Sequence, residues 1–184
     1  MKMHRSIIAP ALMAGCIITM PALAQNTVTF QGEVSSQTCT VSINGTPNAV
    51  VMLPTANLAD LTGSAGKATG VTPFTVAISN CTAVSSGDTA IKTKFLGHSV
   101  DSATGVLGNL ATASPAVGVG IQLTQKSDGS GPVNLNGPTA VPGLVLKQNE
   151  TSASYDFGAQ YYSLSSAPTA GAVTAVAEYT LSYL

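Results

Sequence analysis

The stretch Pro73-Phe74-Thr75-Val76-Ala77-Ile78-Ser79-Asn80-Cys81 determines the fold class of this chain of 184 residues. Its large apolar residues occupy every second position, which is the period of a β-strand that buries one face. Other segments with the same period each predict a strand, and their apolar positions are Val28, Phe30, Gly32 and Val34; Val117, Val119, Ile121 and Leu123; Tyr155, Phe157, Ala159 and Tyr161; and Val173, Ala175, Ala177, Tyr179, Leu181 and Tyr183. The sequence therefore predicts an all-β protein.

Loops rich in glycine, proline, serine and asparagine separate these segments. They include Gly63–Gly66, Ser127–Pro132 and Asn136–Pro138, and residues of these types favour turns. Two stretches are less regular, since Leu58–Leu61 is compatible with a short helical turn and Val100–Ala116 with an irregular excursion. Short strands separated by turns are typical of an antiparallel β-sandwich, which is the fold that we expect.

The first residues predict an export signal. A basic start precedes an apolar run from Ile7 to Met20, and the small residues Ala22 and Ala24 follow it. A membrane-spanning helix needs roughly 20 apolar residues, so this run is short for a span, and its flanks are those of a cleaved signal peptide. We therefore expect residues 1–24 to be a signal peptide and the mature chain to begin at Gln25.

A second interpretation of this region is a lipid-attachment site. Leu12–Cys16 loosely resembles the box in which a cysteine thiol is acylated. The apolar run continues through Ile17 and Ile18, however, and the small residues of Ala22–Ala24 form a better cleavage site. Cleavage there would discard Cys16 with the signal peptide.

The mature chain carries little charge. Without Lys2 and Arg5 it has five basic residues against eight acidic ones, which is a net charge of −3. It lacks the cluster of basic residues with which proteins bind nucleic acids or anionic membranes. We therefore expect no nucleic-acid binding and no direct membrane insertion after signal cleavage. Cleavage also leaves only Cys39 and Cys81, which in an exported chain predict one disulfide rather than a metal site or a redox pair.

The start of the mature chain shows a change of phase. The apolar positions from Val28 to Val34 are even-numbered, whereas those from Cys39 to Ile43 are odd-numbered, and one strand does not change faces without a bulge. Residues 25–34 therefore predict a separate strand. With its linker it forms an extension, residues 25–38, ahead of a single domain that comprises residues 39–184.

The end of the chain predicts an open sheet edge. The final strand, Val173–Tyr183, would leave one edge unpaired and available for strand addition from another chain. Alternatively, the two ends of the chain pair within one molecule, because edge strands are common in sheets. The pattern of residues favours neither arrangement.

Five segments, together with Cys39, carry a resemblance that extends over the whole mature chain: Thr27–Val34, Pro73–Cys81, Val117–Leu123, Phe157–Tyr162 and Pro168–Tyr183. In these segments the sequence resembles the major subunits of type 1 pili of the chaperone–usher class. The resemblance implies an incomplete immunoglobulin-like antiparallel β-sandwich, the pilin fold. Its seventh strand is missing, a hydrophobic groove lies beside the final strand, and a strand donated by another subunit completes the fold.

The resemblance also implies partners and roles for particular residues. In that family a periplasmic chaperone first fills the groove, and the extension of the next subunit replaces it at the outer-membrane usher. The implied donor face is Val28, Phe30, Gly32 and Val34. The implied groove edge and chaperone contact are Val173, Ala175, Ala177, Tyr179, Leu181, Tyr183 and Leu184. Cys39 and Cys81 match the family's disulfide. We therefore expect identical or related pilin subunits, the chaperone and the usher as partners, and export through the periplasm to a fimbria at the cell surface.

No group of residues predicts catalysis. His98 is the one histidine of the mature chain and follows an expected strand at Ala90–Leu96, and the acidic residues are scattered near turns. Because neither a glycine-flanked nucleophile nor a close pair of carboxylates is present, we expect a structural subunit that is not an enzyme and uses no cofactor or metal. The alternative is a minor adaptor or a tip subunit, including an adhesin for host glycans, although a one-domain chain with an apolar extension argues against the adhesin.

Overall fold

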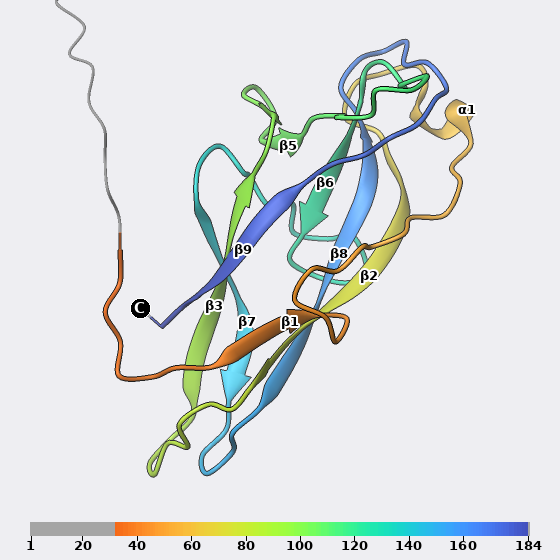
Figure 1. The fold of residues 1–184 in the computed structure, drawn as a ribbon. Coiled ribbons are helices and arrows are strands. Elements are labelled where there is room, and N and C mark those ends of the chain that lie inside the picture. The colour runs from red at the N-terminus through yellow and green to blue at the C-terminus, as the bar shows by residue number, and fades with distance from the viewer. Residues whose placement is uncertain (1–31, 184) are drawn as a thin grey trace, which may run out of the picture. The chain divides into compact units, whose positions relative to one another are not determined.

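The computed structural model describes residues 32–183, and these fold as a sandwich of two antiparallel sheets (Figure 1). The elements are β1 (Thr40–Ile43), α1 (Leu58–Leu61), β2 (Ala68–Ser79), β3 (Thr89–Gly97), β4 (Val100–Asp101), β5 (Val106–Leu107), β6 (Val119–Thr124), β7 (Thr139–Leu146), β8 (Ala153–Ser163) and β9 (Ala177–Ser182). One sheet has the order β1-β2-β8-β6-β5-β4 and the other β7-β3-β9. The predicted all-β antiparallel class is confirmed. No helix among the described residues is long and apolar enough to cross a membrane.

Aromatic rings from both sheets form the centre of the core. Phe74 of β2 stacks on Phe157 of β8 with ring centroids 5.8 Å apart. Phe95 of β3 meets both rings edge-on, at 6.3 Å from Phe74 and 5.5 Å from Phe157. All three side chains are buried, and each such burial stabilises the fold by about 1.5–3 kcal/mol. These contacts join the two sheets.

The alternation that the sequence shows corresponds to the two faces of the strands. Phe74, Val76 and Ile78 of β2 are buried, as are Val119, Ile121 and Leu123 of β6. Val117 differs from the prediction, because it precedes β6 and its side chain is 64% exposed. The reason is Gly118, whose φ of +69° is outside the extended region, so the strand begins only after this residue.

Two local expectations at the start of the domain are met. Cys39 and Cys81 form a disulfide, which joins the residue before β1 to the residues that follow β2. The short helix α1 covers Leu58–Leu61, where the Asn57 side chain caps it by accepting a hydrogen bond from the Ala59 amide at 3.0 Å.

The strand β7 is not among the strands that the sequence predicts. It pairs with β3 and forms one of the two outer strands of the smaller sheet, opposite β9. Its pairing shifts by one residue at Gly143, because Lys92 faces Pro142 whereas Ile91 faces Leu144. The bulge places the buried Val141 and Leu144 on the same face although their spacing is three residues.

Candidate functional site

The last strand of the domain pairs on one edge only. β9 pairs with β3 from Gly97↔Ala177 to Lys92↔Ser182, and within the described chain no strand lies on its other edge. The strand begins at Ala177, so the predicted strand from Val173 is too long. Residues 173–176 nevertheless continue the alternation, with odd-numbered side chains half-buried and even-numbered ones exposed.

Hydrogen bonds show which way the backbone of residues 172–176 faces. The carbonyl oxygens of Ala172, Thr174 and Val176 accept bonds from the amides of Ala116, Leu110 and His98, at 2.9, 2.7 and 3.0 Å. In an extended chain the amide and carbonyl of each residue point to the edge opposite that of its neighbours. The odd-numbered residues from Val173 to Leu181 therefore direct their backbone groups to the open edge.

Asn109 positions the beginning of this edge. Its Nδ2 group donates to the carbonyls of Ala116 and Ala172 at 2.9 and 2.8 Å. Its Oδ1 atom accepts from the amides of Ala111 and Thr174 at 3.0 and 2.9 Å. The side chain thus takes the place of a neighbouring strand where β3 no longer reaches. Residues 172–174 stay extended because of these bonds.

A second extended segment, 49–53, forms the opposite wall. Ala49, Val51 and Leu53 are half-buried against the core, whereas Val50 and Met52 are 78% and 79% exposed. Among the described residues, none forms a backbone hydrogen bond with this segment. The segment is therefore extended like a strand, and its amides and carbonyls have no backbone partner among the described residues. The alternation of apolar residues does not predict a strand here; the uninterrupted apolar run of residues 49–53 is the signal that could have indicated one.

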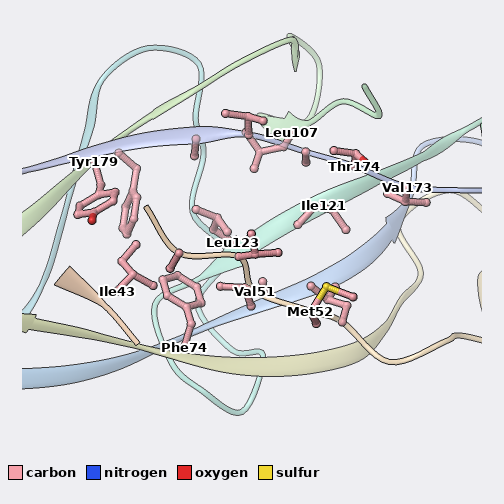
Figure 2. Close-up of a pocket in the computed structure, with 18 of the residues that line it drawn as sticks. Ile43, Val51, Met52, Phe74, Leu107, Ile121, Leu123, Val173, Thr174 and Tyr179 are labelled. Carbon is pink, nitrogen blue, oxygen red and sulfur yellow. The ribbon is translucent and has the colours of Figure 1, made fainter. Parts of the chain in front are cut away.

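Between the two walls lies an apolar groove of about 600 Å³ (Figure 2). Its floor is the core itself, and the residues that form it are Ile43, Phe74, Phe95, Leu107, Ile121, Leu123, Ala159 and Tyr161. The walls are residues 49–53 and Val173, Thr174, Ala175, Val176, Ala177 and Tyr179. In Figure 2, Val51, Phe74 and Leu123 point into the same space. One more apolar strand in this groove would cover the core and find backbone partners at the open edge.

Two tyrosines, one in β9 and one just after it, form hydrogen bonds with residues near the start of the domain. The Tyr179 hydroxyl donates to the carbonyl of Pro47 at 2.6 Å, and the Tyr183 hydroxyl accepts from the amide of Cys39 at 3.1 Å. Burial raises the pKa of Tyr179 above its ordinary value. Burial also raises the pKa of Tyr183; the hydrogen bond from Cys39 opposes this shift, and the nearby Glu33 carboxylate adds to it. The Tyr179 bond links one wall to the residues just before the other wall, and the Tyr183 bond links the end of the chain to the residue before β1.

The segment before β1 returns to the end of β9. The Glu33 carboxylate accepts from the Tyr183 amide at 2.8 Å and from the Ser182 hydroxyl at 3.0 Å. The neighbouring Val34 side chain is fully exposed, and a β-carbon built on Gly32 would meet no atom within 4 Å. Of the predicted donor face, Val28 and Phe30 lie outside the described residues, as do Leu184, Cys16 and the predicted signal peptide.

Polar clusters elsewhere in the described domain belong to turns and to the surface. His98 lies 3.0 Å from Glu178, with both side chains largely exposed, and Lys147 lies 2.8 Å from Asp88. A hydrogen bond from Thr104 lowers the pKa of Asp101, which caps the turn between β4 and β5. Within residues 32–183, no group of three histidine, cysteine or acidic side chains could hold a metal ion.

The fold and the groove define a class of protein, a β-sandwich whose last strand leaves one edge unpaired above an apolar groove. Residues 28–184 match the family model described as fimbrial protein, so this chain belongs to the fimbrial protein family. It is a structural subunit of a fimbria, a fibre of the cell surface.

Relatives of known identity include both kinds of fimbrial subunit. The chain is 36% identical to the minor fimbrial subunit HifD of Haemophilus influenzae, over 99% of this chain and 83% of that protein. It is 35% identical to the major fimbrial subunit SMF-1 of Stenotrophomonas maltophilia, over 87% of this chain and 93% of that protein. A subunit in the solved structure of a chaperone–usher pilus shares the fold with a TM-score of 0.58 at 20% identity, over 90% of this chain and 99% of that one.

Proposed function

We propose that this subunit polymerises by strand donation, in which residues 25–34 of one copy fill the groove of the next. The observation that carries the proposal is the groove between residues 49–53 and β9, because its floor is the hydrophobic core and one edge lacks a partner strand. An extended segment of residues 25–34 is roughly 34 Å long at about 3.4 Å per residue, which is sufficient to follow residues 173–183.

The donated face is Val28, Phe30, Gly32 and Val34. Burial of the three larger side chains would stabilise each subunit contact by about 1.5–3 kcal/mol per residue, and the donated backbone would bond to the open edge. Val34 supports this role, because its side chain is fully exposed within its own subunit. The acceptor surface is the odd-numbered series from Val173 to Tyr183, with Leu184 at its end.

The remaining roles are proposed from the sequence and from its resemblance to chaperone–usher pilins. Residues 1–24 direct export and are removed, residues 25–38 form the donor extension and its linker, and residues 39–184 form the acceptor domain. A periplasmic chaperone covers the groove before assembly, and an outer-membrane usher is the place where the donor strand replaces it. The subunit has no catalytic role and needs no cofactor.

Gly32 provides a clean test of strand donation. Because a β-carbon at Gly32 meets no atom within 4 Å in its own subunit, Gly32→Leu should leave the domain folded. In the groove of a neighbour the leucine would meet the floor, so we expect loss of fibres from the cell surface while the subunit itself still accumulates. Gln31→Leu, which places the same side chain on the opposite face of the strand, is the matched control and should assemble.

Deletion of residues 25–34 is the stronger version of this experiment. The truncated subunit should retain its disulfide and its groove, yet form no fibre in which it is the repeating unit. Electron microscopy of the cell surface, together with mass analysis of sheared fibres, measures this directly. Normal fibres built from the truncated subunit would disprove donation by this segment.

A further inference from the structure

The end of the open edge already has a partner within the same chain. The Tyr183 amide continues the odd-numbered series of backbone groups that face the open edge. It donates a hydrogen bond of 2.8 Å to Glu33 Oε1. Glu33 Oε2 accepts from the hydroxyl of Ser182 at 3.0 Å, and the Ser182 side chain is only 9% exposed. One carboxylate thus binds Ser182, the last residue of β9, and Tyr183, which follows it, and such charge-assisted bonds are stronger than neutral ones.

The segment that carries Glu33 is docked at several points. The Tyr183 hydroxyl accepts from the Cys39 amide at 3.1 Å, and the Gln37 side chain donates to the carbonyl of Thr82 at 2.8 Å. Because Cys39 is bonded to Cys81, these contacts fix the linker close to the end of β9. The docked linker therefore holds Glu33 at the open edge of β9.

We infer that Glu33 is a built-in competitor of the donated strand, which occupies the Tyr183 end of the acceptor edge until a donor displaces it. The inference rests on the proposed function and concerns its regulation. A donated strand can bond to the Tyr183 amide only after the carboxylate leaves, since that amide has one hydrogen to give. Glu33 also lies within residues 25–34, so the same displacement releases the donor segment from its own subunit.

The direct test uses a synthetic peptide as the donor. The peptide comprises residues 25–34, carries a fluorophore, and is added in large excess to the full-chain subunit isolated as a monomer. Glu33→Ala in the subunit should speed peptide association roughly tenfold or more, since tenfold is about the smallest effect expected when a hydrogen bond to a charged group no longer competes. Ser182→Ala, which removes one of the two bonds from the acceptor side, should give a smaller increase.

Glu150→Ala is the matched control. Glu150 is exposed, and its side chain forms no hydrogen bond or ion pair with any described residue, so its removal should leave the association rate unchanged. Equal rates for the parent subunit and Glu33→Ala would overturn the inference. If no variant binds the peptide, strand donation into this groove is wrong, which is a different result.

Hydrogen exchange tests the competitor without any donor. The Tyr183 amide should exchange at least threefold faster in Glu33→Ala than in the parent subunit, whereas amides of β3 should keep their rates. This measurement tests the contact between Glu33 and Tyr183 even if the peptide does not bind. An unchanged rate at Tyr183 would show that Glu33 does not hold the edge.

Discussion

The hydroxyl of Tyr179 donates a hydrogen bond of 2.6 Å to the carbonyl of Pro47 and so joins the two walls of the groove. The residues are 132 positions apart in the sequence. Pro47 lies just before the second wall, residues 49–53, which has no backbone hydrogen bond with the rest of the described chain. This side-chain contact therefore holds residues 49–53 at a fixed distance from β9.

Tyr179→Phe should loosen that wall. We expect the free energy of unfolding to fall by about 1 kcal/mol, the usual net contribution of a neutral hydrogen bond. The amides of residues 49–53 should also exchange faster in the variant. Tyr162→Phe is the matched control, since the Tyr162 hydroxyl has no hydrogen-bond partner among the described residues, and an equal loss in both variants would contradict the role of the bridge.

Alkaline pH should act on the same bond. Burial raises the pKa of Tyr179 above its ordinary value of about 10, so the folded state favours the neutral phenol. The stabilisation is fully present below pH 10 and is lost as the pH rises through the raised pKa, because the phenolate can no longer donate to Pro47. Urea unfolding between about pH 8 and 11 should show this loss in the parent protein and a weaker one in Tyr179→Phe.

Asn109→Ala should disorder the start of the acceptor edge. The substitution removes all four hydrogen bonds of the side chain; among the described residues it leaves the Ala116 carbonyl without a donor and the amides of Ala111 and Thr174 without an acceptor, whereas Ala172 keeps its bond from the Ala116 amide. We expect a loss of about 1–3 kcal/mol in unfolding free energy and faster amide exchange at Thr174. The exposed Asn48, changed to alanine in the control, should have little effect; equal effects would show that Asn109 has no special role.

Two buried threonines should respond in opposite directions to the same substitution. Thr93 is fully buried and its hydroxyl has no hydrogen-bond partner among residues 32–183, whereas the equally buried Thr124 donates to the carbonyl of Lys126 at 2.8 Å. Thr93→Val should therefore stabilise the domain by roughly 1–2 kcal/mol, and Thr124→Val should destabilise it by a similar amount. Thermal unfolding of both variants is the measurement, and a change of the same sign in both would contradict this account.

The strands that were predictable from the sequence are those with an uninterrupted period. Phe74, Val76 and Ile78 keep the same phase through the whole of their segment, and all three are buried. The strand β7 could not be found in this way. Its bulge at Gly143 shifts the phase between Val141 and Leu144, and the pair Pro142-Gly143 within it resembles a turn.

The site was predictable in part, because only one of its walls has an alternating pattern. The odd-numbered series from Val173 indicated the correct face, although hydrogen bonds from Asn109 replace strand pairing over its first residues. The opposite wall is apolar on both faces, with Val50 and Met52 exposed, so its period is hidden. The contact of Glu33 with Tyr183 joins residues 150 positions apart, and no local pattern indicates such a contact.

The disulfide between Cys39 and Cys81 has a mechanical consequence for a fibre. A pulling force on the N-terminal extension enters the domain at Cys39 and crosses the sulfur–sulfur bond to Cys81. Residues 40–80 form a closed covalent loop off this path, so β1, residues 49–53, α1 and β2 carry no tension along their backbone. Covalent tension in a stretched fibre therefore bypasses residues 49–53, the wall of the groove that has no backbone hydrogen bond with the rest of the described chain.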